Sequence, residues 1–148
     1  MRFSSIVKPT FLSTDIKAET KEDAFKEIVS KFHIKHQNIA LKKIIERENQ
    51  SSTGIGGGCA IPHARLEDIK EVYFFVGISR KGIDFKSIDK KPVHLIFLFI
   101  TPLSETATHL KVLSRISRII KDPNLVSRLI EAHDNQELSQ ILLLQPSE

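Results

Sequence analysis

The feature of this 148-residue sequence that most restricts its fold is the run of residues 93–100, in which every position except His94 is apolar. Most of these residues are β-branched or aromatic, which favours a β-strand. A continuous apolar run, without the alternation of a half-exposed strand, is typical of a central strand covered on both faces. The run is far too short to cross a bilayer, which needs about 20 apolar residues. We therefore expect a sheet between two layers of helices.

Other segments are predicted to extend this sheet. Residues 72–78 are β-branched and aromatic, and residues 83–85 follow a Lys-Gly turn and form a short strand candidate. Residues 59–66 are predicted to be extended, because Pro62 has a fixed φ and excludes the preceding residue from the helical region. Residues 51–58 contain four glycines and are predicted to be a loop.

Apolar residues at helical spacing predict the helices of both layers. The predicted helices cover residues 21–32, 38–48, 104 or 105 to 121, a segment beginning at Pro123, and 136–144. In the long third helix we expect an inward face of Leu110, Leu113, Ile116 and Ile120. The elements together indicate an α/β fold, with one domain over residues 1–148 and a mixed β-sheet of about five strands flanked by helices on both faces.

Composition narrows the class of protein further. The hydrophobic share of 41% and charged share of 27% fit a folded globular domain. A single cysteine, Cys59, and the lack of a leader pattern at the start of the chain favour a cytoplasmic location without a membrane span. The net charge of +4 is spread along the chain, and with no Trp and one Tyr nucleic-acid binding is disfavoured.

The segment around His63 carries the chemistry. Its neutral imidazole is a nucleophile near pH 7, and glycine-rich main-chain N–H groups can bind the oxygens of a phosphoryl group. Arg65 offers a planar set of donors two residues further on. A glycine loop beside a histidine also occurs where a structural turn precedes a strand, and the residues alone fit both interpretations.

Several motifs together give the chain a family resemblance. They are Glu46-Arg47-Glu48, Ser52-Thr53-Gly54-Ile55-Gly56, Ala60-Ile61-Pro62-His63, Gly82-Ile83-Asp84-Phe85, Pro92-Val93 and His109-Leu110. With these motifs the chain resembles enzyme IIA of the bacterial phosphoenolpyruvate-dependent sugar phosphotransferase system, of the fructose, mannitol and nitrogen-regulatory type. The resemblance extends over nearly the whole chain.

The resemblance implies a role for each site residue. His63 would be the phosphorylated residue, with His109 bonding near the phosphoryl group and Arg47 neutralising its charge. Thr53 and the main chain of Gly57 and Gly58 would be further oxygen donors. The donor would be a histidine-containing phosphocarrier protein, and the acceptor an enzyme IIB component or a regulatory target. No cofactor or metal is implied.

Some features leave other interpretations open. Ala64 stands where many relatives have glycine, which adds a methyl group beside the site. Arg47 lies between two glutamates and could form only an exposed ion pair. A regulatory binding module that does not transfer the group is the main alternative, and sugar uptake is another; without a fused transport segment, regulation is the more natural use. A metal-dependent hydrolase needs ligands that the sequence does not offer.

The remaining histidines and basic residues are expected to be structural. His33 and His36 have a spacing that can bind metal, but no Cys or acidic cluster accompanies them, so we assign no metal. His94 and His133 are expected to be satisfied core or surface residues. Four basic residues recur at helical spacing in the third helix and predict a solvated face, or else a surface for an acidic partner or nucleic acid: Lys111, Arg115, Arg118 and Lys121.

Overall fold

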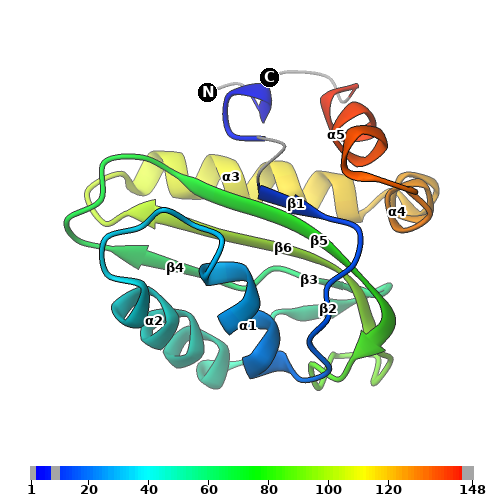
Figure 1. The fold of residues 1–148 in the computed structure, drawn as a ribbon, viewed down its shortest axis with the longest axis horizontal. Coiled ribbons are helices and arrows are strands. Elements are labelled where there is room, and N and C mark those ends of the chain that lie inside the picture. Colours follow the sequence, from blue (N-terminus) through cyan, green and yellow to red (C-terminus); the bar gives the residue numbers. More distant parts are fainter. Residues whose placement is uncertain (1–2, 8–10, 145–148) are drawn as a thin grey trace.

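The fold is a sheet with helices on both faces, seen in a computed structural model that describes residues 3–7 and 11–144 (Figure 1). The strands of this part are β1 (Leu12–Ser13), β2 (Gly54–Gly56), β3 (Cys59–Ala60), β4 (His63–Leu66), β5 (Tyr73–Ile83) and β6 (Val93–Pro102). The helices are a 3₁₀ turn (Phe3–Ser5), α1 (Lys21–Val29), α2 (Gln37–Gln50), α3 (Thr106–Ile120), α4 (Pro123–Ile130) and α5 (Asn135–Leu143).

Strand β6 is the centre of a mixed sheet. The strand order is β1-β5-β6-β3-β2, and β4 pairs with β6 as well. Strand β5 is antiparallel to β6, whereas β3 and β4 are both parallel to it and follow one another along the same edge. Cys59 lies opposite Leu95 and His63 lies opposite Phe99, so the chain advances along β6 between the two strands.

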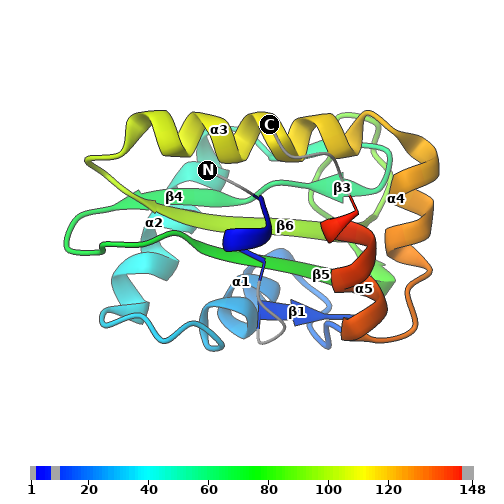
Figure 2. The same ribbon diagram turned by 90° about the horizontal axis from the view of Figure 1, so that it is seen from above.

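The predicted central strand is confirmed, since β6 is buried and packs into a separate core on each face. Leu95, Phe97 and Phe99 belong to the core beneath α3, α4 and α5, and the residues between them belong to the core beneath α1 and α2. Figures 1 and 2 show α1 and α2 on one side of the sheet and α3 and α5 on the other. The α/β class, the mixed sheet and the two helical layers are therefore confirmed.

Several element boundaries differ from the sequence prediction. Residues 83–85 form no separate strand, because β5 continues to Ile83. Part of the predicted glycine loop is the short edge strand β2, and the described sheet has a sixth member in β1, whose two residues are too few to show a pattern. The first helix ends at Val29, three residues before the predicted end.

The prediction for the inward face of α3 was wrong at Leu110, which is 58% exposed. The buried side of α3 instead carries Val112, Ile116 and Ile119 together with two polar residues, His109 and Arg115. Because polar residues occupy two core-facing positions, an apolar pattern alone misplaces the face by part of a turn. Burial of Arg115 also removes it from the predicted basic surface of this helix.

Candidate active site

His63 is the first residue of β4, and its ring is fixed by the turn just before it. The ring atom Nδ1 lies 2.7 Å from the carbonyl oxygen of Ile61. A carbonyl can only accept a hydrogen bond, so Nδ1 carries the proton and donates it. The other ring nitrogen, Nε2, therefore holds a free lone pair.

The surroundings of His63 keep the ring uncharged. It is half-buried and stacks on Phe99, with 5.2 Å between ring centroids and 15° between planes. Burial lowers the pKa of His63; the bond to Ile61 opposes this, the charge of Arg47 lowers the pKa further and that of Glu48 raises it. The result lies below the ordinary value of 6.5. At pH 7 His63 is a neutral nucleophile.

His109 lies beside His63 in the first turn of α3. Their ring centroids are 5.4 Å apart, and His109 is buried. Its Nδ1 lies 2.6 Å from the hydroxyl oxygen of Thr101, a buried residue near the end of β6. Burial, followed by the charges of His63 and Arg65, lowers the pKa of His109 to about 4. His109 is therefore also neutral at pH 7.

Both histidines line an open cleft of about 410 Å³. Helix α2 contributes Lys43 and Arg47 to its wall, and the guanidinium of Arg47 is anchored by donating from Nη1 to the carbonyl of Ser51 at 3.0 Å. The full lining is Lys43, Glu46, Arg47, Gln50, His63, Ala64, Arg65 and His109. Three cations against one carboxylate make the cleft suited to a phosphoryl group.

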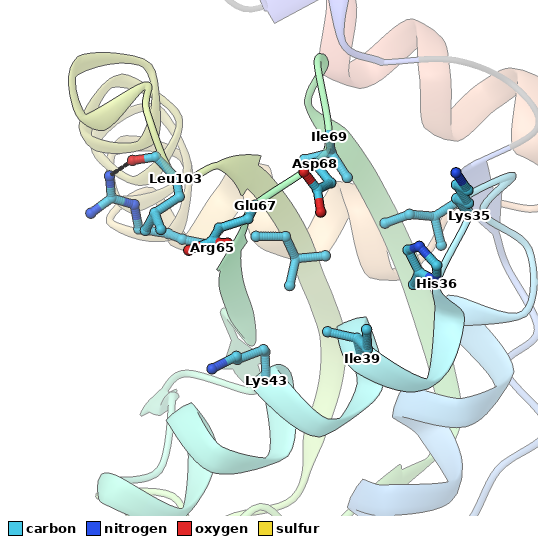
Figure 3. A pocket seen from close by; sticks show the side chains of 11 residues that line it. Lys35, His36, Ile39, Lys43, Arg65, Glu67, Asp68, Ile69 and Leu103 are labelled. Carbon is cyan, nitrogen blue, oxygen red and sulfur yellow. Dashed lines mark hydrogen bonds between the residues drawn. The ribbon is translucent and has the colours of Figure 1, made fainter.

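Arg65 reaches the same cleft but has partners of its own. Its Nη2 donates to the carbonyl of Leu103 at 2.5 Å and to the hydroxyl of Thr106 at 2.6 Å. Figure 3 shows the side chain turned toward Leu103, at the border of a second cavity of about 350 Å³. Arg65 thus ties β4 to the start of α3, and its positive charge helps to lower the pKa of His109.

Gly57 and Gly58 do not lie at the cleft, which corrects the expectation that their amides surround His63. The carbonyl of Gly58 accepts from the amides of His94 and Leu95, at 2.8 and 3.0 Å, near the start of β6. His63 lies opposite Phe99, about 16 Å further along that strand at about 3.3 Å per residue. The amide of Gly57 donates to Asp89. The extended segment between loop and histidine carries them apart.

Thr53 is buried, its amide and hydroxyl both bond Glu48, and it too is absent from the lining of the cleft. Its amide donates to Oε2 of Glu48 at 2.8 Å, and its hydroxyl donates to Oε1 at 2.7 Å. The proposed phosphate contact is therefore replaced by a structural one. From the sequence, Glu48 was considered only as a neighbour of Arg47. Its special role was indicated by one feature: it is a carboxylate in the last turn of a helix, where the helix macrodipole disfavours negative charge.

Thr101 is a second residue that the sequence interpretation missed. It ends the apolar run, and in α/β sheets the carboxyl ends of central strands are where ligand-binding residues gather. That position, rather than any motif, was the signal. Its hydroxyl sets the orientation of the His109 ring.

The other histidines lie away from the cleft. His36 precedes the first turn of α2, His94 bonds the carbonyl of Ser79 at 2.8 Å, and His133 bonds Glu137 at 3.1 Å. Among residues 3–7 and 11–144, no three side chains of the His, Cys, Asp and Glu type gather as a metal site. Within the same ranges, no helix is long and apolar enough to span a membrane.

The fold and cleft define the class: an α/β protein with a neutral histidine at the carboxyl end of its central strand, facing a positively charged cleft. The chain belongs to the family described as "Phosphoenolpyruvate-dependent sugar phosphotransferase system, EIIA 2", whose model matches residues 5–144.

Known relatives agree with this assignment. The nitrogen regulatory protein of Escherichia coli K12 is 33% identical over 96% of this chain and 90% of its own length. The crystal structure of the nitrogen regulatory protein IIA-Ntr from Neisseria meningitidis has a TM-score of 0.87 at 27% identity, over 94% of this chain and 97% of that one. Enzyme IIA mannitol of Escherichia coli, solved in complex with phosphorylated enzyme IIB mannitol, shares the fold, with a TM-score of 0.77 at 16% identity over 94% and 98% of the two chains.

Proposed function

We propose that this protein is a phosphoryl carrier of the nitrogen-regulatory enzyme IIA type, and that His63 is the residue that carries the group. The observation that supports this most strongly is the bond from Nδ1 to Ile61, which leaves Nε2 of a neutral ring free beside a cationic cleft. The donor is a histidine-containing phosphocarrier protein.

The transfer is a direct displacement at phosphorus. The lone pair of Nε2 forms the new N–P bond while the bond between phosphorus and the imidazole of the donor breaks, and the electron pair leaves with that imidazole. The proton stays on Nδ1, hydrogen-bonded to the Ile61 carbonyl, so no proton has to leave His63 during the attack. The reaction therefore depends on positioning and on stabilisation of charge.

Arg47 and His109 supply that stabilisation. The guanidinium of Arg47, on α2, can donate to the phosphoryl oxygens and neutralise their charge. When the Thr101 hydroxyl donates to Nδ1 of His109, Nε2 of His109 carries its proton and becomes a neutral donor toward the cleft. Lys43 and Arg65 add positive charge without taking part in the displacement.

The experiment is intact mass after incubation with phosphoenolpyruvate and the two upstream carrier enzymes. The wild-type protein gains one phosphoryl group, and His63→Ala gains none. His33→Ala is the matched control, because His33 is exposed and the bond that it accepts from the Tyr73 hydroxyl is made by its main-chain carbonyl, which the substitution keeps. Incorporation that persists in His63→Ala would refute the assignment of this residue.

The fate of the group separates regulation from sugar uptake. The relatives named above favour the nitrogen-regulatory type, in which phosphorylation switches binding to a regulatory target. The phosphorylated protein is mixed with purified enzyme IIB of the fructose and mannitol systems. We expect the phosphoryl group to stay on His63; rapid transfer to either protein would favour sugar uptake.

A further inference from the structure

We propose that Glu48 is a positioning residue, which holds the His63 ring with Nε2 free by acting through Thr53 and Ile61. The tautomer assignment stands on the geometry alone, while its value for phosphoryl transfer rests on the proposed function.

Glu48 lies where a negatively charged carboxylate is energetically unfavourable. It lies in the last turn of α2, near the negative end of the helix dipole, and its side chain is only 2% exposed. Three donors compensate: the Thr53 amide, the Thr53 hydroxyl and, at 3.1 Å, the ammonium of Lys21. Two of the three belong to Thr53, so the main effect of Glu48 is to fix that residue.

Thr53 transmits this fixed position to the histidine. Its carbonyl accepts from the Ile61 amide at 3.2 Å, and the Ile61 carbonyl accepts from Nδ1 of His63 at 2.7 Å. Pro62, between Ile61 and His63, restricts the backbone of Ile61 to extended conformations. Glu48 therefore determines, over two residue-to-residue contacts, where the carbonyl that selects the tautomer lies.

The tautomer of a histidine is set by the bond that one ring nitrogen makes. If Thr53 is released, the segment of residues 60–62 can shift and the Nδ1 bond weakens. The ring then populates the tautomer with the proton on Nε2, which cannot attack phosphorus. Glu48 could instead act on His63 only through its charge, and the two mechanisms predict different variants to be affected.

Two substitutions separate geometry from charge. Glu48→Asp keeps the charge but is one methylene too short to reach both Thr53 groups. Glu48→Gln loses the charge, yet its carbonyl can accept from the Thr53 amide and its NH₂ can donate to the Thr53 hydroxyl. Glu22→Asp is the control, since it makes the same change at an exposed carboxylate of α1.

The readout is the pair of ¹⁵N resonances of the His63 ring, measured above its pKa. We expect Glu48→Asp to shift both resonances toward the Nε2–H tautomer, and Glu48→Gln and Glu22→Asp to keep the wild-type values. Wild-type resonances in Glu48→Asp overturn the proposal, as does an equal shift in both Glu48 variants. If Glu48→Asp does not fold, Thr53→Val serves: a smaller shift in the same direction supports the proposal, and unchanged resonances overturn it.

Phosphorylation kinetics supply the second readout. In Glu48→Asp the rate of transfer falls about tenfold, as expected for a slightly misplaced nucleophile, while the apparent KM for the phosphocarrier stays unchanged. A change confined to KM overturns the positioning role. If wild-type protein accepts no phosphoryl group, the proposed function fails, and the ¹⁵N comparison still decides the role of Glu48.

Discussion

The two ends of β6 carry two different kinds of unusual sequence, and the candidate site lies at one of them. At the end where the strand begins lie the glycines of residues 54–58, which bond Asp89 and the first residues of the strand. At the end where it finishes lie Thr101, His63 and His109, together with the cations of α2. Reactive and charged side chains, rather than a glycine-rich main chain, distinguish the end of β6 that holds the candidate site.

Among the variants that test this difference between the two ends of β6, the largest loss of phosphorylation rate is expected at Arg47 and His109. Removing one donor to a developing negative charge slows a reaction about 10²–10³-fold. We expect Arg47→Ala and His109→Ala each to slow phosphorylation of His63 by a factor in that range, measured by quenched-flow mass spectrometry. Unfolding midpoints close to that of the wild-type protein are the control for Arg47, whose side chain is only half-buried. Wild-type rates in both variants would remove their roles.

A smaller effect is expected at Thr101, which acts only through His109. Thr101→Val leaves a buried ring nitrogen without its partner, which costs about 1–3 kcal/mol of unfolding free energy. We also expect transfer to slow about tenfold, because the His109 tautomer is no longer fixed. Thr101→Ser keeps the hydroxyl and should retain most of the rate. A Thr101→Val protein with wild-type kinetics would show that the Thr101–His109 bond is structural.

The lowered pKa values of His109 and His63 predict how stability and the rate of phosphorylation depend on pH. His109 has a pKa of about 4 when folded against 6.5 as its ordinary value, so the unfolded chain binds more protons between these values. Stability is therefore fully present above pH 6.5 and decreases as the pH falls toward 4, by about 1.4 kcal/mol per pH unit at most.

Urea unfolding at a series of pH values measures this slope, and His109→Gln should reduce it. The rate of phosphoryl acceptance should be flat near pH 7, since His63 is already neutral there, and should fall as the pH drops through the lowered pKa of His63. A rate that instead rises as the pH falls through that pKa would mean that the reactive form of His63 is not the neutral one.

The difference between the two ends also explains what the sequence could predict. The buried strand and the Pro62-His63 step follow from local chemistry. The central strand and the two helical layers could therefore be predicted from the sequence, and His63 could be chosen as the candidate nucleophile. Which residues surround His63 depends on register: Cys59 opposite Leu95 and His63 opposite Phe99 separate the glycines from the histidine they precede. The partners of Glu48 and Thr101 depend on tertiary contacts that no spacing in the chain reveals.

The smallest effect on phosphorylation is expected at the end where β6 begins, which holds the glycines of residues 54–58. Gly57 and Gly58 have φ values of +65° and +80°, and a Cβ at either position meets no atom within 4 Å. Gly57→Ala and Gly58→Ala should therefore lower the unfolding free energy only through the strain of a left-handed backbone at alanine, by about 1–2 kcal/mol. Because both residues lie far along β6 from the nucleophile, we expect wild-type rates of His63 phosphorylation. A slowing comparable with that of Arg47→Ala would return these amides to the phosphoryl site and undo the distinction between the two ends.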